Sequence, residues 1–158
     1  MKIFPMIEKT LIILKPDAVS RGLIGEVISR LEKTGLQLSG CKMQHLSTEI
    51  LKEHYSHLVD KPFFPDILKY MQASPVMLQV WTGDNAAVII RKLVGVTNPA
   101  EALPGTIRGD FALNIARNII HASEDSDAAK TEVARFFADN ELFSYERCDH
   151  TMLYELDR

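Results

Sequence analysis

The sequence contains little of what several large protein classes require. Among its 158 residues are two cysteines, Cys41 and Cys148, which are far apart and show no CxxC spacing. We expect reduced thiols rather than a disulfide framework or a zinc site. Long apolar runs are also missing: the segment from Met1 to Glu8 is too short for a signal peptide, and no later segment could span a bilayer. A cytoplasmic location away from membranes is therefore expected.

Common motifs for phosphate, metal and hydrolase chemistry are missing as well. There is no GxxxxGK[ST] loop, no HExxH pair and no nucleophile elbow. Gly22 and Gly25 supply only a fragment of a dinucleotide fingerprint. The net charge of −3, from 18 basic and 21 acidic side chains, argues against a general nucleic-acid coat. Apolar residues at 46% and charged residues at 25% predict one globular domain over residues 1–158.

The hydrophobic pattern of the first half alternates between strands and amphipathic helices. Residues 10–14 predict a buried strand ending at Lys15, and apolar residues at 24, 27, 28 and 31 predict a helix that Gly35 stops. Residues 36–46 predict a second strand, and Ser47 is a helix-start residue. The following helix carries His54 and Tyr55 in its apolar stripe. Another helical stripe covers residues 64–71, with Phe63 outside it.

The second half continues the alternation around one irregular segment. A third strand covers residues 75–82, and Asp84 or Asn85 can cap a helix that stops at Gly95. Periodicity is lost from residue 97 to 110, which predicts a long, turn-rich loop of the kind that often carries function. The last strand runs into His121, and Ser123 with the acids after it resembles the first turn of the final helix.

These elements appear in the order strand, helix, strand, two helices, strand, helix, loop, strand, helix. This is a βαββαβ arrangement with additions, which predicts an α+β fold with helices covering a mostly antiparallel sheet. His121 would then stand where a strand ends, open to solvent on one side. A neutral imidazole in such a position is a usable nucleophile. The alternative is a core histidine at a strand end.

Several polar and aromatic residues fall outside the predicted core stripes and together match a nucleoside polyphosphate. Cations suit phosphates, an aromatic ring suits the base, and neutral polar groups suit the ribose. Each residue alone also fits a solvated strand end, a turn former or a surface charge. The set is Lys15, Phe63, Arg91, Thr97, Arg108, Asn118 and His121.

Motifs along nearly the whole chain, from about Lys9 to Glu155, resemble those of nucleoside diphosphate kinases. Residues 118–123 read NIIHAS, which resembles the active-site signature of that family. The other matching stretches, in order, are KPD at 15–17, RGLIGE at 21–26, KEHY at 52–55, KPFF at 61–64, TNPA at 97–100 and PGTIRGDF at 104–111. Glu124 departs from the usual aspartate and Ala122 from a frequent glycine, and we expect little consequence from either.

The resemblance implies a ferredoxin-like fold with a four-stranded sheet and a magnesium-dependent, ping-pong transfer of the γ-phosphate between nucleotides. His121 would be phosphorylated transiently. The family pattern assigns the phosphates to Arg91, Thr97 and Arg108, the ribose to Lys15 and Asn118, the base to Phe63, and support of the histidine to Tyr55, Glu132 and Ser123.

The resemblance also implies cofactor and partners. Mg²⁺ would be held mainly by the nucleotide phosphates, with no metal site on the protein. Stacking is base-tolerant, so ATP, GTP, ADP and GDP should all serve. A homo-oligomer is expected, and the loop at Pro99 and the tail at 153–155 favour a hexamer over a tetramer. Two alternatives stay open: a non-catalytic relative, and a ferredoxin-like regulatory or nucleic-acid-binding module, although no specific nucleic acid is expected.

Overall fold

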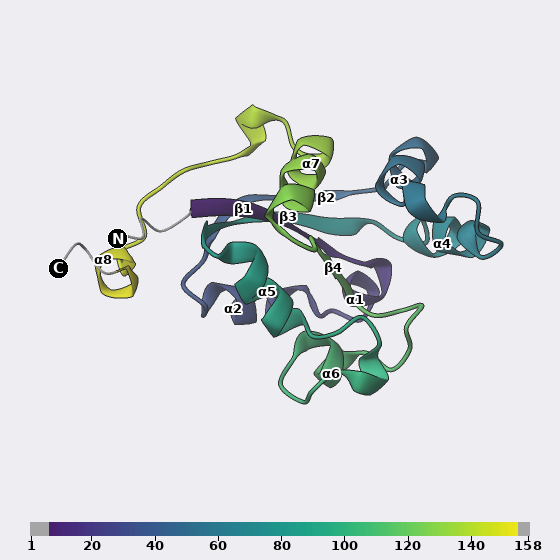
Figure 1. Ribbon diagram of the computed structural model, residues 1–158, viewed down its shortest axis with the longest axis horizontal. Helices are drawn as coiled ribbons and strands as arrows, with labels where there is room; N and C mark the ends of the chain where they lie inside the picture. The colour runs from purple at the N-terminus through teal and green to yellow at the C-terminus, as the bar shows by residue number, and fades with distance from the viewer. Residues whose placement is uncertain (1–6, 155–158) are drawn as a thin grey trace.

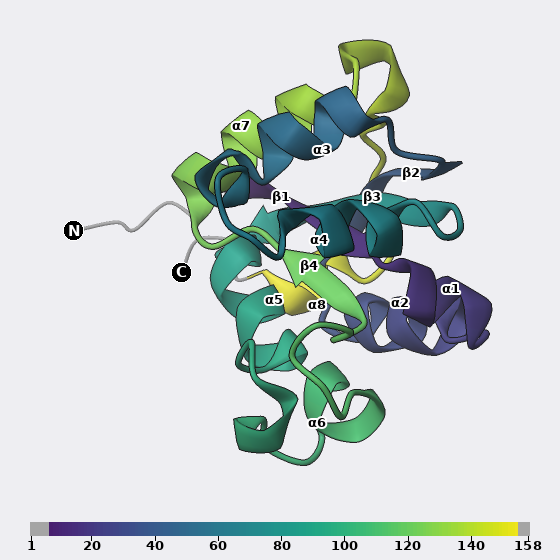
Figure 2. The same ribbon diagram turned by 90° about the vertical axis from the view of Figure 1, so that its right-hand side faces the viewer.

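The computed structural model describes residues 7–154, which form one four-stranded sheet with helices on both faces (Figures 1 and 2). The start of the chain and Glu155, considered above, lie outside these residues. The sheet has the order β2-β3-β1-β4, and each neighbouring pair is antiparallel. Its strands are β1 (Ile7–Leu14), β2 (Gln37–Gln44), β3 (Val76–Asp84) and β4 (Ile120–Ala122). The predicted α+β, ferredoxin-like arrangement is confirmed.

Helices connect and cover these strands. The α-helices are α1 (Pro16–Ser20), α2 (Ile24–Glu32), α3 (Thr48–His54), α4 (Phe64–Met71), α5 (Ala86–Val94), α6 (Ile107–Phe111), α7 (Ser126–Phe136) and α8 (His150–Leu153). Short 3-10 turns are η1 (Ser56–Leu58), η2 (Pro99–Glu101) and η3 (Asp139–Glu141). The segment predicted as a loop therefore contains η2 and α6, which are too short to show an apolar period. No helix within residues 7–154 is long and apolar enough to cross a bilayer.

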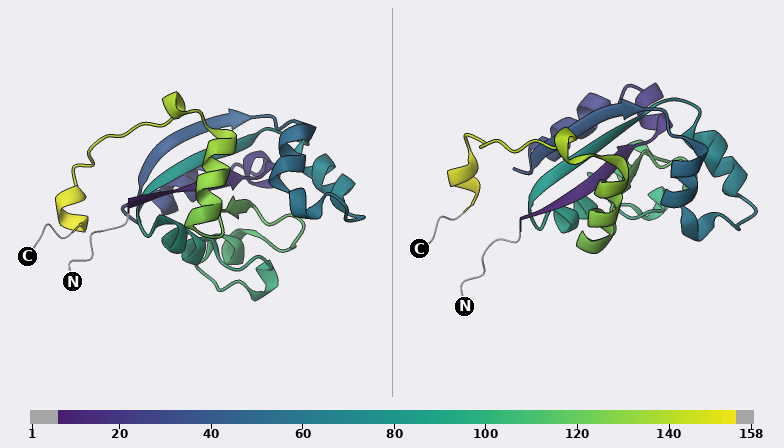
Figure 3. Two further views of the ribbon diagram at one scale, coloured as in Figure 1. Left: turned by 45° about the horizontal axis from the view of Figure 1, so that its top comes forward. Right: turned by 90° about the horizontal axis from the view of Figure 1, so that it is seen from above.

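Strand β1 separates two apolar cores. Leu11 and Ile13 face the layer of α3, α4 and α7, whereas Ile12 and Leu14 face the layer of α2 and α5. Figure 2 shows these two layers on opposite faces of the sheet, and Figure 3 shows α7 crossing the strands. Successive side chains of a strand point to opposite faces, so a strand covered on both faces must be apolar throughout. This accounts for the unbroken apolar run in β1.

Two predicted helix starts differ from the structure. Asn85 precedes α5 in a left-handed conformation (φ 51°), and its side chain does not cap the helix. The carboxylate of Glu8, far away in sequence, accepts a hydrogen bond from Ala87 N instead (2.9 Å). Asparagine tolerates the left-handed region, so Asn85 serves the turn rather than the cap.

The other difference is the start of α7. This helix begins at Ser126, and Asp125 caps it by accepting hydrogen bonds from the next backbone amides. Ser123, predicted in the first helical turn, instead continues the sheet edge: Ser123 N donates to Leu11 O, and Leu11 N donates to Ser123 Oγ (3.2 Å each). Pairing with β1 therefore outweighs the local helix-start signal and buries Ser123 completely.

Candidate active site

An unusual turn precedes the strand that carries His121. Ile120 N donates to Asn118 O (2.8 Å) across Ile119, whose φ is +73°. A γ-turn with positive φ is rare and strained, and more so for a β-branched residue. Two contacts hold it: Asp17 Oδ2 accepts from Ile119 N (3.1 Å), and Lys15 N donates to Ile119 O (2.8 Å). The turn thereby fixes the direction in which the chain enters β4.

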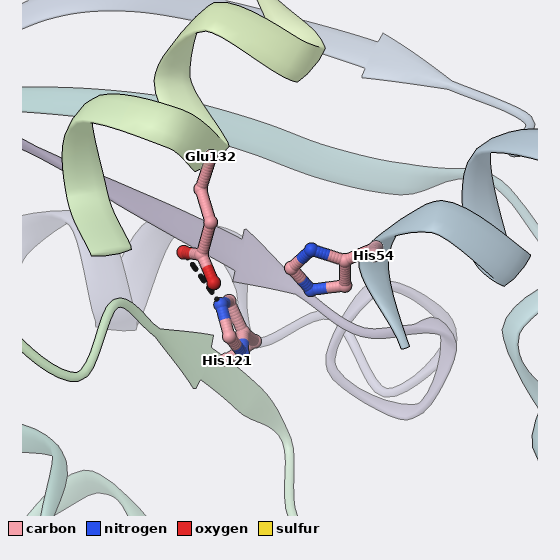
Figure 4. A group of neighbouring side chains, drawn as sticks. All are labelled: His54, His121 and Glu132. Atoms are coloured by element: carbon pink, nitrogen blue, oxygen red, sulfur yellow. Dashed lines mark hydrogen bonds and ion pairs between the residues drawn. The ribbon is translucent and has the colours of Figure 1, made fainter. Parts of the chain in front are cut away.

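His121 is oriented by Glu132 of α7 (Figure 4). Its Nε2 lies 3.0 Å from Glu132 Oε2, and Ser123 Oγ donates to the same oxygen (2.6 Å). Although burial raises the pKa of the Glu132 carboxyl, the hydrogen bonds from His121 and Ser123 outweigh it and lower the pKa to about 2. An ionised carboxylate only accepts hydrogen bonds, so Nε2 of His121 carries the hydrogen. The lone pair is therefore on Nδ1.

Three of the predicted nucleotide-binding residues form one hydrogen-bonded chain. Lys15 Nζ donates to Asn118 Oδ1 (2.7 Å), and Asn118 Nδ2 donates to the backbone oxygen of Thr97 (3.0 Å). Burial and the nearby charge of Arg108 lower the pKa of Lys15 to about 8. This series of hydrogen bonds connects the end of β1, the turn before β4 and the segment after α5.

Arg108 is the most buried of the predicted cations, with 5% of its surface exposed. Its Nη1 donates to Gly95 O (2.9 Å) and its Nη2 to Ile120 O (2.7 Å), next to His121. Burial and the charge of Arg91 lower the pKa of Arg108 to about 10. Arg108 therefore lies close enough to Lys15 and Arg91 for like-charge repulsion to lower the pKa values of Lys15 and Arg108. Lowered pKa values of this kind cluster at functional sites.

Two predicted residues are less directly connected to His121. Phe63 precedes α4 and is 48% exposed. The hydroxyl of Tyr55 donates to Met71 Sδ (3.9 Å), and its ring lies edge-on to His54, with centroids 4.7 Å apart. Tyr55 therefore contacts His54, and the ring of His54 in turn lies 4.6 Å from the ring of His121.

Two further residues belong to this site but are not among the predicted site residues: His54 and Asp17. The apolar pattern of α3 correctly predicts that His54 is buried, but it gives no sign that His54 contacts His121. Asp17 belongs to the KPD motif. Its carboxylate joins the strained turn to Tyr70, whose hydroxyl donates to Oδ1. The motif was the available signal for Asp17, whereas the sequence offers none for the contact of His54.

One group of side chains in residues 7–154 has the composition of a metal site: His54, His121 and Glu132, with ligand atoms within 4.8 Å of one another. Mg²⁺ prefers an octahedron of oxygen ligands, which two imidazoles and one carboxylate do not provide. A nitrogen-binding ion also fits poorly, because Arg135 Nη1 lies 3.2 Å from His54 Nδ1. An ion at Nε2 would push the hydrogen of His54 onto Nδ1, against that guanidinium.

Comparisons with known proteins point to one family. The family model described as nucleoside diphosphate kinase matches residues 8–142. A nucleoside diphosphate kinase of Haloquadratum walsbyi is 50% identical over 153 residues, covering 96% of this chain and 97% of the relative. One from Parabacteroides distasonis is 50% identical over 150 residues, covering 95% of this chain and 98% of the relative.

Solved structures give the same result. A nucleoside diphosphate kinase of Halobacterium salinarum in complex with CDP superposes with a TM-score of 0.90 at 41% identity, covering 94% of this chain and 99% of that one. A nucleoside diphosphate kinase family protein from Babesia bovis also gives a TM-score of 0.90 at 41% identity, covering 93% of this chain and 99% of that one. Fold and site thus define a nucleotide-binding phosphotransferase. The chain belongs to the nucleoside diphosphate kinase family.

Proposed function

We propose that this single-domain kinase works by a ping-pong mechanism through a phosphohistidine on His121, with Mg²⁺ bound to the nucleotide. The orientation of His121 carries the proposal. Glu132 accepts the hydrogen bond from Nε2 and leaves the Nδ1 lone pair free. His121 is the middle residue of the short strand β4, not its end as predicted, and it follows Ile120, whose carbonyl binds the buried cation Arg108. A nucleophile, an adjacent orienting group and a cationic environment are the parts that phosphoryl transfer through an enzyme intermediate needs.

The proposed first step is an in-line displacement. Nδ1 of His121 forms a bond to the γ-phosphorus while the bond from that phosphorus to the β–γ bridging oxygen breaks, and the nucleoside diphosphate leaves with that electron pair. The ring gains positive charge, which the Glu132 carboxylate stabilises, and its Nε2 hydrogen stays in place. The reverse reaction with another diphosphate restores the enzyme. One site can serve donor and acceptor because both present a diphosphate to the same cations.

The nucleotide would be held by the residues described above. We propose that Arg91, Arg108 and Thr97 bind the phosphates, whereas Lys15 and Asn118 bind the ribose hydroxyls. Phe63, half exposed at the start of α4, would stack on the base. Because every base has a π-face, this predicts weak discrimination among ATP, GTP and CTP. The relative from Halobacterium salinarum was solved in complex with CDP, which supports nucleotide binding by this chain.

Magnesium would arrive with the nucleotide. The one candidate ligand cluster in residues 7–154 does not suit it, as described above. Phosphate oxygens and water supply the hard ligands that Mg²⁺ prefers, and the ion would neutralise phosphate charge. The residues of the chain would then bind and orient the nucleotide and the histidine.

The test is to isolate the intermediate. Incubation with ATP labelled in the γ-phosphate and magnesium, without acceptor, should leave up to one phosphoryl group per subunit. A phosphoramidate survives alkali and is lost in acid, unlike a serine ester. Adding GDP or CDP should discharge the label as the matching triphosphate. Intersecting rather than parallel double-reciprocal lines would contradict the proposal, because a ternary complex needs no enzyme intermediate.

We also propose that the chain assembles as a hexamer rather than a tetramer. Large apolar side chains are exposed between η2 and β4, namely Leu103, Leu113 and Ile115 (73%, 96% and 59%). Exposed apolar surface of this kind is typical of interaction sites. Pro99, in the same segment, is buried within its own subunit and so would shape the contact indirectly. Analytical ultracentrifugation distinguishes the two assemblies from a monomer.

A further inference from the structure

His54 is enclosed by aromatic rings directly beside His121. It is 7% exposed, and its ring lies edge-on to three others: Tyr55 at 4.7 Å, His121 at 4.6 Å and Phe136 at 5.2 Å between centroids. The planes of His54 and His121 meet at 81°, so the edge of one ring contacts the face of the other. Figure 4 shows the two imidazoles beneath α7. This contact restricts rotation of the His121 ring about its Cβ–Cγ bond.

Arg135 determines where His54 carries its hydrogen. Its Nη1 lies 3.2 Å from His54 Nδ1, and its Nε donates to Glu53 Oε1 (2.9 Å). A guanidinium only donates hydrogen bonds, so Nδ1 of His54 accepts and Nε2 bears the hydrogen. Among residues 7–154, that buried Nε2 has no hydrogen-bond partner.

His54 also stays uncharged. Burial, His121, Arg135 and Lys15 lower its pKa, Glu132 opposes them, and the result is about 3. These groups face His54 from α7, β4 and the end of β1, while Tyr55 follows it directly after the last residue of α3. A neutral neighbour matters because the ring of His121 becomes positive as Nδ1 attacks phosphorus. A charged His54 would repel that developing charge.

We propose that Arg135 and His54 act together as positioning residues for His121: Arg135 fixes the tautomer of His54, and His54 holds the His121 ring so that Nδ1 faces the phosphate. The inference rests on the proposed role of His121 as nucleophile. Helix α7 would then set both imidazoles from two positions three residues apart, Glu132 for His121 and Arg135 for His54. The resemblance to nucleoside diphosphate kinases assigns no role to either His54 or Arg135.

The test begins with Arg135→Leu, which removes the donor and the charge but keeps an apolar side chain on α7. The single-turnover rate of His121 phosphorylation by ATP and magnesium should fall about tenfold near neutral pH, as for other supporting partners of a functional histidine. The loss should grow toward about pH 5, because His54 no longer has the cation that opposes its protonation. Arg135→Lys should restore part of the rate.

Matched controls separate this effect from a general change in charge. Lys130→Leu makes the same charge change on the same helix, at a side chain that is 75% exposed, and should keep the native rate and pH profile. Glu53→Gln removes only the exposed end of the Arg135 ion pair and should also change little. A merely structural role for Arg135 would lower stability without adding a pH dependence.

A double-mutant cycle tests whether Arg135 acts through His54. In a His54→Phe background, which keeps a ring but no nitrogen, Arg135→Leu should cause no further loss of rate. The inference would be overturned if the rate losses of the two single variants multiplied in the double variant. It would also be overturned if Arg135→Leu kept the native rate both near neutral pH and at about pH 5. The same holds for ¹⁵N NMR showing the hydrogen of His54 on Nδ1 in the wild type. Failure of the wild type to form any phosphohistidine would instead overturn the proposed function.

Discussion

Replacing His121 by glycine should reduce nucleotide turnover by about 10⁵-fold or more, which corresponds to about 7 kcal/mol. The variant would lack the nitrogen that accepts the phosphoryl group, while the cations and the nucleotide-binding residues remain. The free energy of unfolding should fall by about 2 kcal/mol: a glycine in a strand costs about 1 kcal/mol, and Glu132 loses one of its two hydrogen-bond donors. The His121 side chain is partly exposed and completes no apolar core. Steady-state turnover and urea unfolding measure the two quantities.

Glu132→Gln is the matched control for this loss. Glutamine keeps the shape and one acceptor oxygen but not the charge, so turnover should fall about 10- to 100-fold while the labelled intermediate still forms. The carboxylate also affects acid stability. The pKa of Glu132 in the folded protein, about 2, is lower than its pKa in the unfolded chain. The ionised carboxylate therefore stabilises the fold at pH values above the unfolded-state pKa. This stabilisation is lost as the pH falls through the folded-state pKa. An acid-labile label on the His121→Gly protein would refute the assignment.

The order of strands and helices was predictable because it depends on local signals. Apolar residues repeat at intervals of three and four in α2 and α4, and the unbroken apolar run of β1 has the length of a strand. Such patterns determine which face of an element is buried, whatever the rest of the chain does. The candidate site residues came from motifs, and their catalytic roles stay predictions until the variants are measured.

The contacts within the site could not be predicted in the same way. Ile119 N reaches Asp17 Oδ2 across 102 positions, and Leu11 pairs with Ser123 across 112. A positive φ at an isoleucine opposes its intrinsic preference, so no local rule indicates it. It persists because the tertiary structure supplies partners on both sides of the turn. The pairing of Ser123 with Leu11 likewise explains why α7 begins at Ser126 and not at Ser123.

Arg108→Met should lower both stability and turnover. The two carbonyls that Arg108 binds, Gly95 O and Ile120 O, would lose a buried donor, at a cost of about 1–3 kcal/mol each. Removal of a buried cation whose pKa is already lowered to about 10 offsets part of this loss. We expect a net destabilisation of about 2 kcal/mol. Turnover should fall about 10²- to 10³-fold, as for other groups that stabilise a transferring phosphoryl group.

Arg91→Met separates the two effects. Arg91 is exposed in the last turn of α5, so its loss should change the free energy of unfolding by no more than about 0.5 kcal/mol while turnover still falls. Urea unfolding and steady-state kinetics on both variants give the comparison. Native turnover in Arg108→Met would remove this residue from the phosphate site. Native stability in Arg108→Met would mean that water replaces the guanidinium at both carbonyls. The buried cation links the two properties because it joins the end of α5 to β4 beside the nucleophile.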